Sequence, residues 1–159
     1  GKKSDHQDIR KPGYQVIRTL KQMQENKNST NPEKTVAGFE KLWVWQKAHH
    51  LMQEIHQFCK TLPKTEDFKL KDQIERCSSS VCDNIAEGHT AYYYKEKIKG
   101  FYIARKEAGE TQNQLRKLLG KKYLSPELSQ NWVEGYEEII RGINGYVRYI
   151  NKKKNSKKP

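Results

Sequence analysis

The stretch 125–150, SPELSQNWVEGYEEIIRGINGYVRYI, decides the fold. Its large apolar residues recur every three or four positions and therefore line one face of an α-helix. They are Trp132, Tyr136, Ile140, Ile143, Val147 and Ile150. The helix also has a clear start, because Ser125 is a favourable N-cap and Pro126 suits the first helical position. This stretch therefore predicts a long amphipathic helix that must bury its apolar face against other helices.

Three earlier segments show the same helical spacing, at about residues 39–62, 67–88 and 94–119. The first carries two adjacent apolar lines, which are Trp45, Ala48, Met52, Ile55, Cys59 and Leu62 beside Val44, Leu51 and Phe58. The second aligns Leu70, Ile74, Cys77, Val81 and Ile85, and the third aligns Phe101, Ala104, Ala108, Thr111, Leu115 and Leu118. Pro63, Gly88 and Gly120 mark the expected ends. Four such stripes with short connections predict an all-α protein, an antiparallel up-down four-helix bundle over residues 39–151.

Both ends of the chain are strongly basic, and the formal net charge of the 159 residues is +12. Residues 1–38 hold eight Lys and Arg against four Asp and Glu, and residues 152–159 hold five Lys and no acid. We expect a basic arm and linker over 1–38, in which the spacing at 13–25 fits a short helix, and a disordered Lys-rich tail over 152–159. Such ends attract polyanions by releasing counterions, or they are solvated segments that only aid solubility.

Composition and motifs argue against several classes of protein. The sequence contains no run of about 18 apolar residues that could span a membrane, and its N-terminal segment lacks the apolar core of a secretory signal. Three cysteines without paired spacing favour reduced thiols and a cytoplasmic location. Ser78, Ser79 and Ser80 lie in mid-helix with no histidine one turn away, and His49 and His56 lack further ligands. We therefore expect no enzyme, no metal site and no cofactor.

A polar face on the second predicted helix is the least generic feature of the chain. Gln73, Arg76, Ser80, Asn84 and Glu87 follow one another at intervals of three or four residues. An amide, a guanidinium and a carboxylate on one face can form oriented hydrogen bonds. The face is predicted to be a polar seam in a subunit interface or a buried network, with an ordinary hydrated surface as the alternative.

Basic residues recur along the third predicted helix, at its exit and at the end of the fourth. They are Lys95, Lys97, Lys99, Arg105, Lys106, Arg116, Lys117, Lys121, Lys122, Arg148, Lys152, Lys153, Lys154, Lys157 and Lys158. Lys and Arg bind phosphates, so these residues are candidate nucleic-acid ligands. Tyr92, Tyr93 and Tyr94 either pack to close the corner between the second and third helices or form a stacking platform for bases.

Several stretches, taken together, resemble a known family. They are Leu42–Ala48 (LWVWQKA), Leu62-Pro63 with Glu66, Gln73 and Arg76, Ser80-Val81, Asn84–Gly88 (NIAEG), Tyr102–Arg105 (YIAR), Glu110 and Leu115. Over about residues 39–150 they resemble the four-helix bundle family whose first members are encoded in intervening sequences of bacterial 23S ribosomal RNA genes. Asn84–Gly88 is the most specific part. Thr90-Ala91-Tyr92 stands where the family has a basic residue, and Glu107 where it has a small one, so the nearby corner is expected to differ in its contacts.

The resemblance implies a homopentamer of bundles around a central channel, with no known catalytic activity. It also implies kinship with the accessory variability proteins of diversity-generating retroelements, which are basic pentamers that bind nucleic acid and a partner reverse transcriptase. By position, Asn84, Glu87 and Gly88 belong to the characteristic stretch of the family, and Arg76 and Glu110 match its recurring polar positions.

The residues and the resemblance together lead to one functional expectation and one alternative. We expect a non-catalytic, oligomeric accessory protein of the bacterial cytoplasm that binds RNA or DNA and assists a reverse transcriptase or RNA complex. The alternative is an oligomeric scaffold or protein-interaction module of an rRNA intervening sequence, with no nucleic-acid role. A gel shift with mixed nucleic acid separates the two, because only the first binds polyanions.

Overall fold

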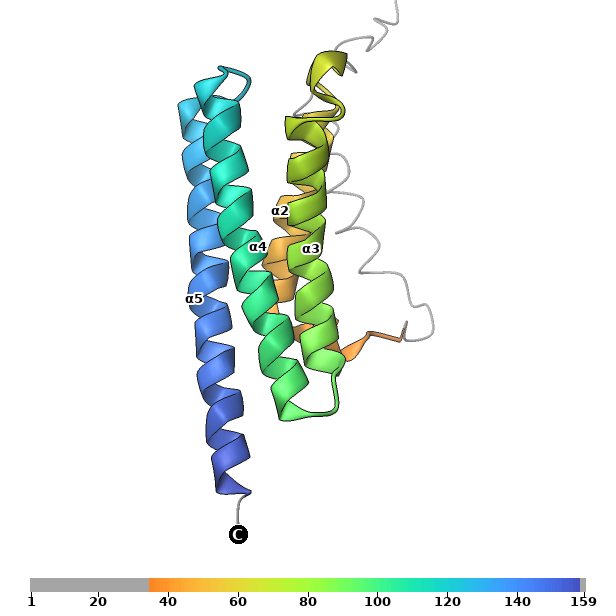
Figure 1. Ribbon diagram of the computed structural model, residues 1–159, viewed down its shortest axis with the longest axis vertical. Helices are drawn as coiled ribbons and strands as arrows, with labels where there is room; N and C mark the ends of the chain where they lie inside the picture. Colours follow the sequence, from red (N-terminus) through yellow and green to blue (C-terminus); the bar gives the residue numbers. More distant parts are fainter. Residues whose placement is uncertain (1–34, 158–159) are drawn as a thin grey trace, which may run out of the picture. The chain divides into compact units, whose positions relative to one another are not determined.

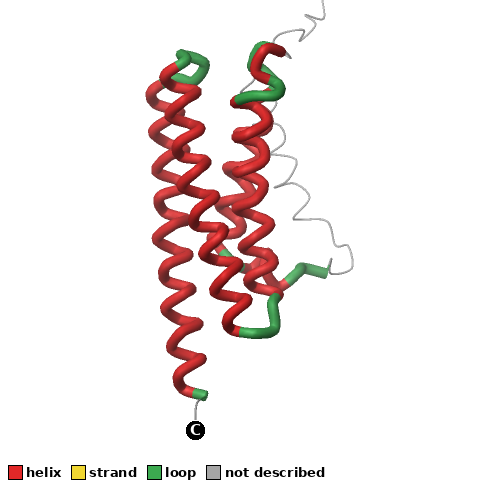
Figure 2. Tube along the Cα trace, in the orientation of Figure 1, coloured by secondary structure: helices red, strands yellow, loops and turns green. Residues whose placement is uncertain are grey.

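Residues 35–157 are described by a computed structural model, in which four α-helices form an antiparallel bundle (Figure 1). The helices are α2 (Trp43–Cys59), α3 (Leu70–Thr90), α4 (Tyr94–Gly120) and α5 (Pro126–Ser156), with 3-10 turns η2 (Gly38–Lys41) and η3 (Lys64–Glu66). Within the described range there is no strand (Figure 2). The predicted all-α class and up-down topology are confirmed. The chain divides between Thr35 and Val36, and the short helix expected at 13–25 lies outside the described residues.

Each helix packs on the next along the chain, and α2 also contacts α5, which closes the ring. The contact between α3 and α4 is the most extensive. Apolar side chains from all four helices fill the centre, and Ile55, Ile74, Leu115 and Ile143 are fully buried there. The bundle therefore has one continuous core, as the four apolar stripes predict.

In two of the helices, the buried residues differ in part from the predicted core lines. In α5, Ile139 is buried and Ile140 is only half-buried. In α2, the buried residues Val44, Ala48, Leu51, Ile55 and Cys59 come from both predicted lines, whereas Trp45 and Met52 are only half-buried. An apolar stripe on a globular helix is wider than one row of residues, so spacing alone does not reveal which of two neighbouring rows faces the axis.

Glycines let the described helices approach one another closely at several places. A Cβ atom on Gly100 of α4 would lie 2.7 Å from Cα and 2.9 Å from N of Gly88 in α3. A Cβ atom on Gly135 of α5 would lie 2.8 Å from Cδ1 of Leu51 in α2. Gly88 is thus a packing residue inside α3, which continues to Thr90, so the prediction that Gly88 ends this helix is wrong.

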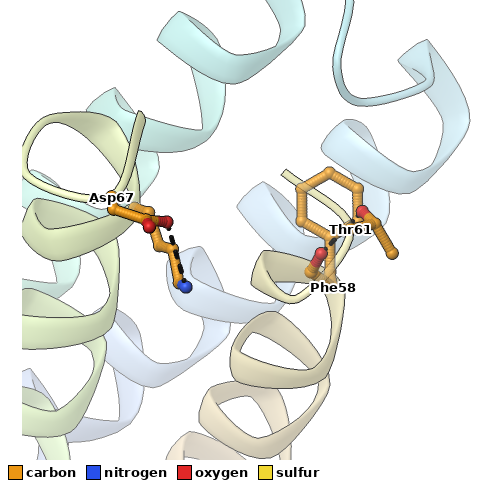
Figure 3. Close-up of polar contacts among 4 residues, drawn as sticks. Phe58, Thr61 and Asp67 are labelled. Atoms are coloured by element: carbon orange, nitrogen blue, oxygen red, sulfur yellow. Dashed lines mark hydrogen bonds and ion pairs between the residues drawn. The ribbon is translucent and has the colours of Figure 1, made fainter. Parts of the chain in front are cut away.

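Local polar contacts hold the connection from α2 to α3. Thr61 Oγ1 donates a hydrogen bond to the carbonyl oxygen of Phe58 at 2.7 Å (Figure 3). Beyond the following turn, Lys71 Nζ lies 3.3 Å from Asp67 Oδ1, one helical turn away in sequence. These contacts fix both sides of the short turn that carries Glu66.

Glu66 is a buried carboxylate that joins this turn to the loop between α4 and α5. Its Oε1 accepts hydrogen bonds from Lys121 Nζ at 2.7 Å and from the Tyr123 hydroxyl at 3.2 Å. The hydrogen bond from Lys121 is the main cause that lowers the pKa of Glu66 below its ordinary value. Since the folded pKa lies below the unfolded one, the ionised carboxylate stabilises the fold above about pH 4.3, and this contribution is lost as the pH falls through the folded pKa.

We therefore expect Glu66→Gln to lower the melting temperature near pH 7 and to lower it less as the pH approaches about 3. The neutral amide keeps the size of the side chain and an acceptor oxygen, but it cannot ionise. Thermal melts followed by circular dichroism at several pH values measure this narrowing difference between the two proteins. A difference that stays constant over the whole range would show that the carboxylate charge is not responsible.

Helix α5 continues to Ser156, so residues 152–156 are helical and the predicted disordered tail is wrong for them. Lysine is a good helix former, and cations are favourable near a helix C-terminus. In addition, Lys153 Nζ lies 4.7 Å from the ring centroid of Tyr149, one turn earlier. The end of α5 extends past the neighbouring ends of α3 and α4 (Figure 1), so these lysines are presented on a helix. Lys158 lies outside the described residues.

Candidate nucleic-acid interface

The start of α4 and the end of α5 bring together cations from two distant parts of the sequence. Because these helices are antiparallel, Lys97 and Lys153 line the same pocket, and Lys157 Nζ lies 6.0 Å from the ring centroid of Tyr94. We call this cluster the basic end. Its members are Lys95, Lys97, Lys99, Arg148, Lys152, Lys153, Lys154 and Lys157. All but the half-buried Lys97 are exposed, and Glu96 is the one acid within residues 94–100 and 148–157.

The other cations predicted as nucleic-acid ligands lie elsewhere on the bundle. Arg105 and Lys106 lie midway along α4. A second group lies at or just beyond the far end of this helix, and it consists of Arg116, Lys117, Lys121 and Lys122. The 27 residues of α4 span about 40 Å at 1.5 Å per residue. The structure therefore separates the predicted set into the basic end and a distant second group.

Three cations outside the basic end are engaged by neighbouring side chains. Arg105 Nη1 donates to Asn144 Oδ1 at 2.8 Å, and Arg116 Nη2 donates to Gln130 Oε1 at 3.2 Å. Lys121 is held by the buried carboxylate described above. Binding a phosphate would require these side chains to break or share such contacts, as it would for Lys97 of the basic end. The basic end is the better candidate interface because it gathers eight cations from two helices.

A pocket of about 370 Å³ opens at the basic end, where the ends of all four helices meet. Its lining residues are Leu42, Gly88, His89, Tyr94, Lys97, Phe101, Tyr146, Tyr149, Ile150 and Lys153. Phe101 and Tyr146 stack on each other, with ring centroids 5.8 Å apart and ring planes inclined by 7°. In this described part of the chain, aromatic and cationic side chains line the pocket and no acidic one does.

The three tyrosines between α3 and α4 take different positions. Tyr92 and Tyr93 are 86% and 65% exposed, and their rings contact each other edge to face. Tyr94, which begins α4, packs against the core and lines the pocket. The interpretation that all three pack to close the corner is therefore wrong for Tyr92 and Tyr93. The connection is so short that their rings project from the bundle instead of reaching the core.

Burial and neighbouring charge affect two titratable groups in the pocket. Burial lowers the pKa of His89, and the nearby Lys97 ammonium lowers it further, so the imidazole is neutral at neutral pH. Lys97 Nζ donates a hydrogen bond to the carbonyl oxygen of His89 at 2.7 Å, which holds the ammonium at the C-terminal end of α3. A hydrogen bond with Tyr149 raises the pKa of Lys153. Positive charge therefore stays beside the aromatic rings at neutral pH.

The predicted polar face of α3 lies at the surface of the described bundle. Gln73, Arg76 and Glu87 are exposed, and Ser80 and Asn84 are half-buried. Asn84 Nδ2 donates to the carbonyl oxygen of Ser80 at 2.8 Å and to its Oγ at 3.0 Å. The interpretation as a network buried within the bundle is therefore wrong, because three of the five side chains face solvent. The interpretation as a subunit interface stays a prediction.

This polar face extends from α3 onto α4. Glu110, which the resemblance places with Arg76 among the recurring polar positions of the family, is half-buried and lies beside Glu107. Burial raises the pKa of Glu107, repulsion by the Glu110 carboxylate and a hydrogen bond donated to that carboxylate raise the pKa further, and the charge of Arg76 opposes the change. Gln114 Nε2 donates to Gln73 Oε1 at 2.9 Å. The face therefore joins amides and charges from both helices.

His56 of α2 lies against the serine run of α3, a contact that sequence analysis missed. Its Nε2 lies 3.3 Å from Oγ of both Ser78 and Ser79 and 3.1 Å from the carbonyl oxygen of Glu75. Both hydroxyls also donate to that carbonyl oxygen, and Ser78 is fully buried, so neither is presented as a nucleophile. The contact crosses between helices, so spacing along one helix gives no signal for it.

Within residues 35–157, no group of three or more His, Cys, Asp or Glu side chains is arranged to bind a metal ion. Cys59, Cys77 and Cys82 are buried free thiols, and burial raises their pKa values to about 12, 11 and 12. None of the described helices is long and apolar enough to cross a membrane.

Comparison with known proteins supports the resemblance. The model of the 23S rRNA-intervening sequence protein family matches residues 40–145. A crystal structure of a protein with unknown function from the S23 ribosomal protein family, from Bacteroides thetaiotaomicron, is 26% identical with a TM-score of 0.61. The match covers 66% of this chain and 95% of that chain. No curated protein matches significantly. Since the family model spans almost the whole bundle, the chain belongs to the 23S rRNA-intervening sequence protein family.

Proposed function

We propose that this chain is a non-catalytic, self-associating protein that binds RNA or DNA through its basic end. The observation that supports this most is the gathering of eight exposed or half-buried cations at the meeting ends of α4 and α5, with Glu96 as the one acid in those two segments. Cationic side chains bind phosphates by releasing condensed counterions, and this needs no particular base sequence. The binding is therefore expected to depend on salt and to tolerate many sequences.

Fluorescence anisotropy of labelled mixed-sequence RNA and DNA tests the proposal. Each phosphate contact adds about 0.7–0.9 to the slope of log affinity against log salt, so about five contacts weaken binding at least a hundredfold between 50 and 200 mM salt. Affinity that is independent of salt would contradict phosphate binding. The absence of binding at low salt would contradict any nucleic-acid role and leave the oligomeric scaffold as the better function.

We also propose that the protein self-associates, with the homopentamer implied by the resemblance as its expected state. Two features support this. Phe68 and Tyr92 are 95% and 86% exposed, and exposed aromatic side chains are common at protein interfaces. The polar face of α3 and α4 offers hydrogen-bonding groups to a second copy. Light scattering gives a mass near five times the 18.7 kDa protomer if the pentamer forms, and a protomer mass if the proposal is wrong.

We further propose an accessory role beside a reverse transcriptase or RNA complex in the bacterial cytoplasm. The support is the kinship with the accessory proteins of diversity-generating retroelements that the family resemblance of residues 39–150 implies. Co-expression with a reverse transcriptase encoded next to the gene, followed by affinity purification of either protein, tests it. If a neighbouring reverse transcriptase fails to co-purify, the accessory role is wrong even where nucleic-acid binding holds.

A further inference from the structure

The pocket at the basic end combines two kinds of side chain that bind nucleotides, aromatic and cationic. Its volume of about 370 Å³ is within the range of about 300–1,000 Å³ that small-molecule sites occupy. Tyr94 and Tyr149 line it together with Lys97 and Lys153. A nucleobase binds to aromatic faces by stacking, and its phosphates bind to cations. The lining therefore suits a nucleotide better than an apolar ligand, which would offer the two ammonium groups no anionic partner.

The ring of Tyr149 is the one most available to a ligand. Phe101 and Tyr146 are already stacked on each other, whereas Tyr149 is 53% exposed. The Lys153 ammonium nitrogen lies 4.7 Å from the centroid of the Tyr149 ring. A lysine on a flexible four-carbon stem can leave the ring when a phosphate is offered. A base can then stack on the vacated ring while the same lysine pairs with the phosphate beside it.

Cations lie in and beside the pocket and can pair with the phosphates next to a bound base. Lys153 lies on the pocket wall, and Lys157 Nζ lies 6.0 Å from the ring centroid of Tyr94. The C-terminal end of α3 carries exposed carbonyl oxygens, which would repel a phosphate. Lys97 donates a hydrogen bond to one of them, the carbonyl oxygen of His89, and so offsets this repulsion. The electrostatic environment therefore favours an anion.

We propose that this pocket receives one unpaired nucleotide of a single-stranded nucleic acid, with its base against Tyr149 and Tyr94 and its phosphates at Lys153 and Lys157. The inference rests on the proposed nucleic-acid binding and makes it specific. In a duplex both faces of each base are covered by neighbouring bases, so a duplex offers phosphates only. The basic end binds phosphates of either form, and the pocket adds affinity for single strands alone.

The test measures the affinity of the full chain for an unstructured oligonucleotide and for a duplex of the same length and sequence. The Tyr149→Leu variant keeps an apolar side chain but loses the aromatic face. We expect it to weaken single-strand binding about five- to thirtyfold, to leave duplex binding unchanged and to keep the salt slope. Tyr149→Phe, which keeps the ring, should restore single-strand binding.

Tyr102→Leu is the matched control. Tyr102 is 40% exposed and carries the Arg105 guanidinium 4.8 Å from its ring centroid, but it does not line the pocket. We expect this variant to bind both oligonucleotides as the unmodified protein does. Unchanged melting temperatures show that each variant is folded.

The outcomes separate this inference from the proposed function. Salt-dependent binding of both oligonucleotides with no effect of Tyr149→Leu overturns the pocket but not the basic end. Equal losses for single strand and duplex likewise overturn it, because stacking cannot act on a duplex. No binding to either oligonucleotide by the unmodified protein overturns both proposals.

Discussion

Replacing Gly100 with alanine is expected to lower the melting temperature of the bundle by about 10 °C. The added Cβ would lie 2.7 Å from Cα and 2.9 Å from N of Gly88. These are backbone atoms of a neighbouring helix, so relief requires α3 and α4 to move apart along their extensive contact. Overpacking of a core costs about 1–3 kcal/mol, and a backbone clash is expected near the upper value. For a domain of this size, that corresponds to about 10 °C.

Gly109→Ala, in the same helix, provides the matched control. A Cβ atom at Gly109 meets nothing within 4 Å. Alanine is favoured over glycine inside a helix by up to about 1 kcal/mol, so this variant is expected to melt at the same temperature or slightly higher. Thermal and denaturant unfolding followed by circular dichroism measure both variants. Equal responses at the two positions would show that the α3–α4 approach does not require glycine.

Gly88 and Gly100 illustrate which features of the fold the sequence predicts and which it does not. The apolar stripes predict the four helices and their antiparallel order, because periodicity reports which face of a helix must be buried. The sequence predicts Gly88 as a helix end, since glycine commonly follows a last helical turn. Its actual role depends on Gly100, which lies twelve residues later on another helix. A close approach between helices leaves no local pattern, so one sequence does not reveal it.

The candidate interface was predictable in its chemistry but not in its grouping. The lysines of α4 and those after Arg148 are evident as cations in the sequence. Their division into the basic end and a distant group depends on the length and direction of α4 and α5. The prediction that residues 152–159 are disordered also prevented this grouping from being foreseen, because a disordered tail has no defined neighbours. Once α5 continues to Ser156, Lys153 and Lys157 lie beside the start of α4.

The second large effect is expected for neutralising the end of α5, in a variant that carries Lys152→Gln, Lys154→Gln and Lys157→Gln. All three side chains are exposed, so the fold should keep its melting temperature. Removing about three phosphate contacts lowers the slope of log affinity against log salt by about 2 for single-stranded RNA. Such a change corresponds to roughly a hundredfold or greater loss of affinity at about 50 mM salt. Lys97 and Lys153, the two lysines that line the pocket, are retained.

A second triple variant, Lys60→Gln, Lys64→Gln and Lys69→Gln, removes the same net charge from exposed positions at the opposite end of the bundle. Long-range attraction between the whole protein and a polyanion falls equally in both variants, and it is largely screened beyond about 10 Å at 0.1 M salt. Only contacts at the basic end distinguish them. We therefore expect this control to lose at most about threefold in affinity. It should also keep its salt slope, because that slope depends on the number of phosphate contacts made at the interface. Equal losses in the two variants would mean that net charge alone attracts nucleic acid and that the meeting ends of α4 and α5 form no interface.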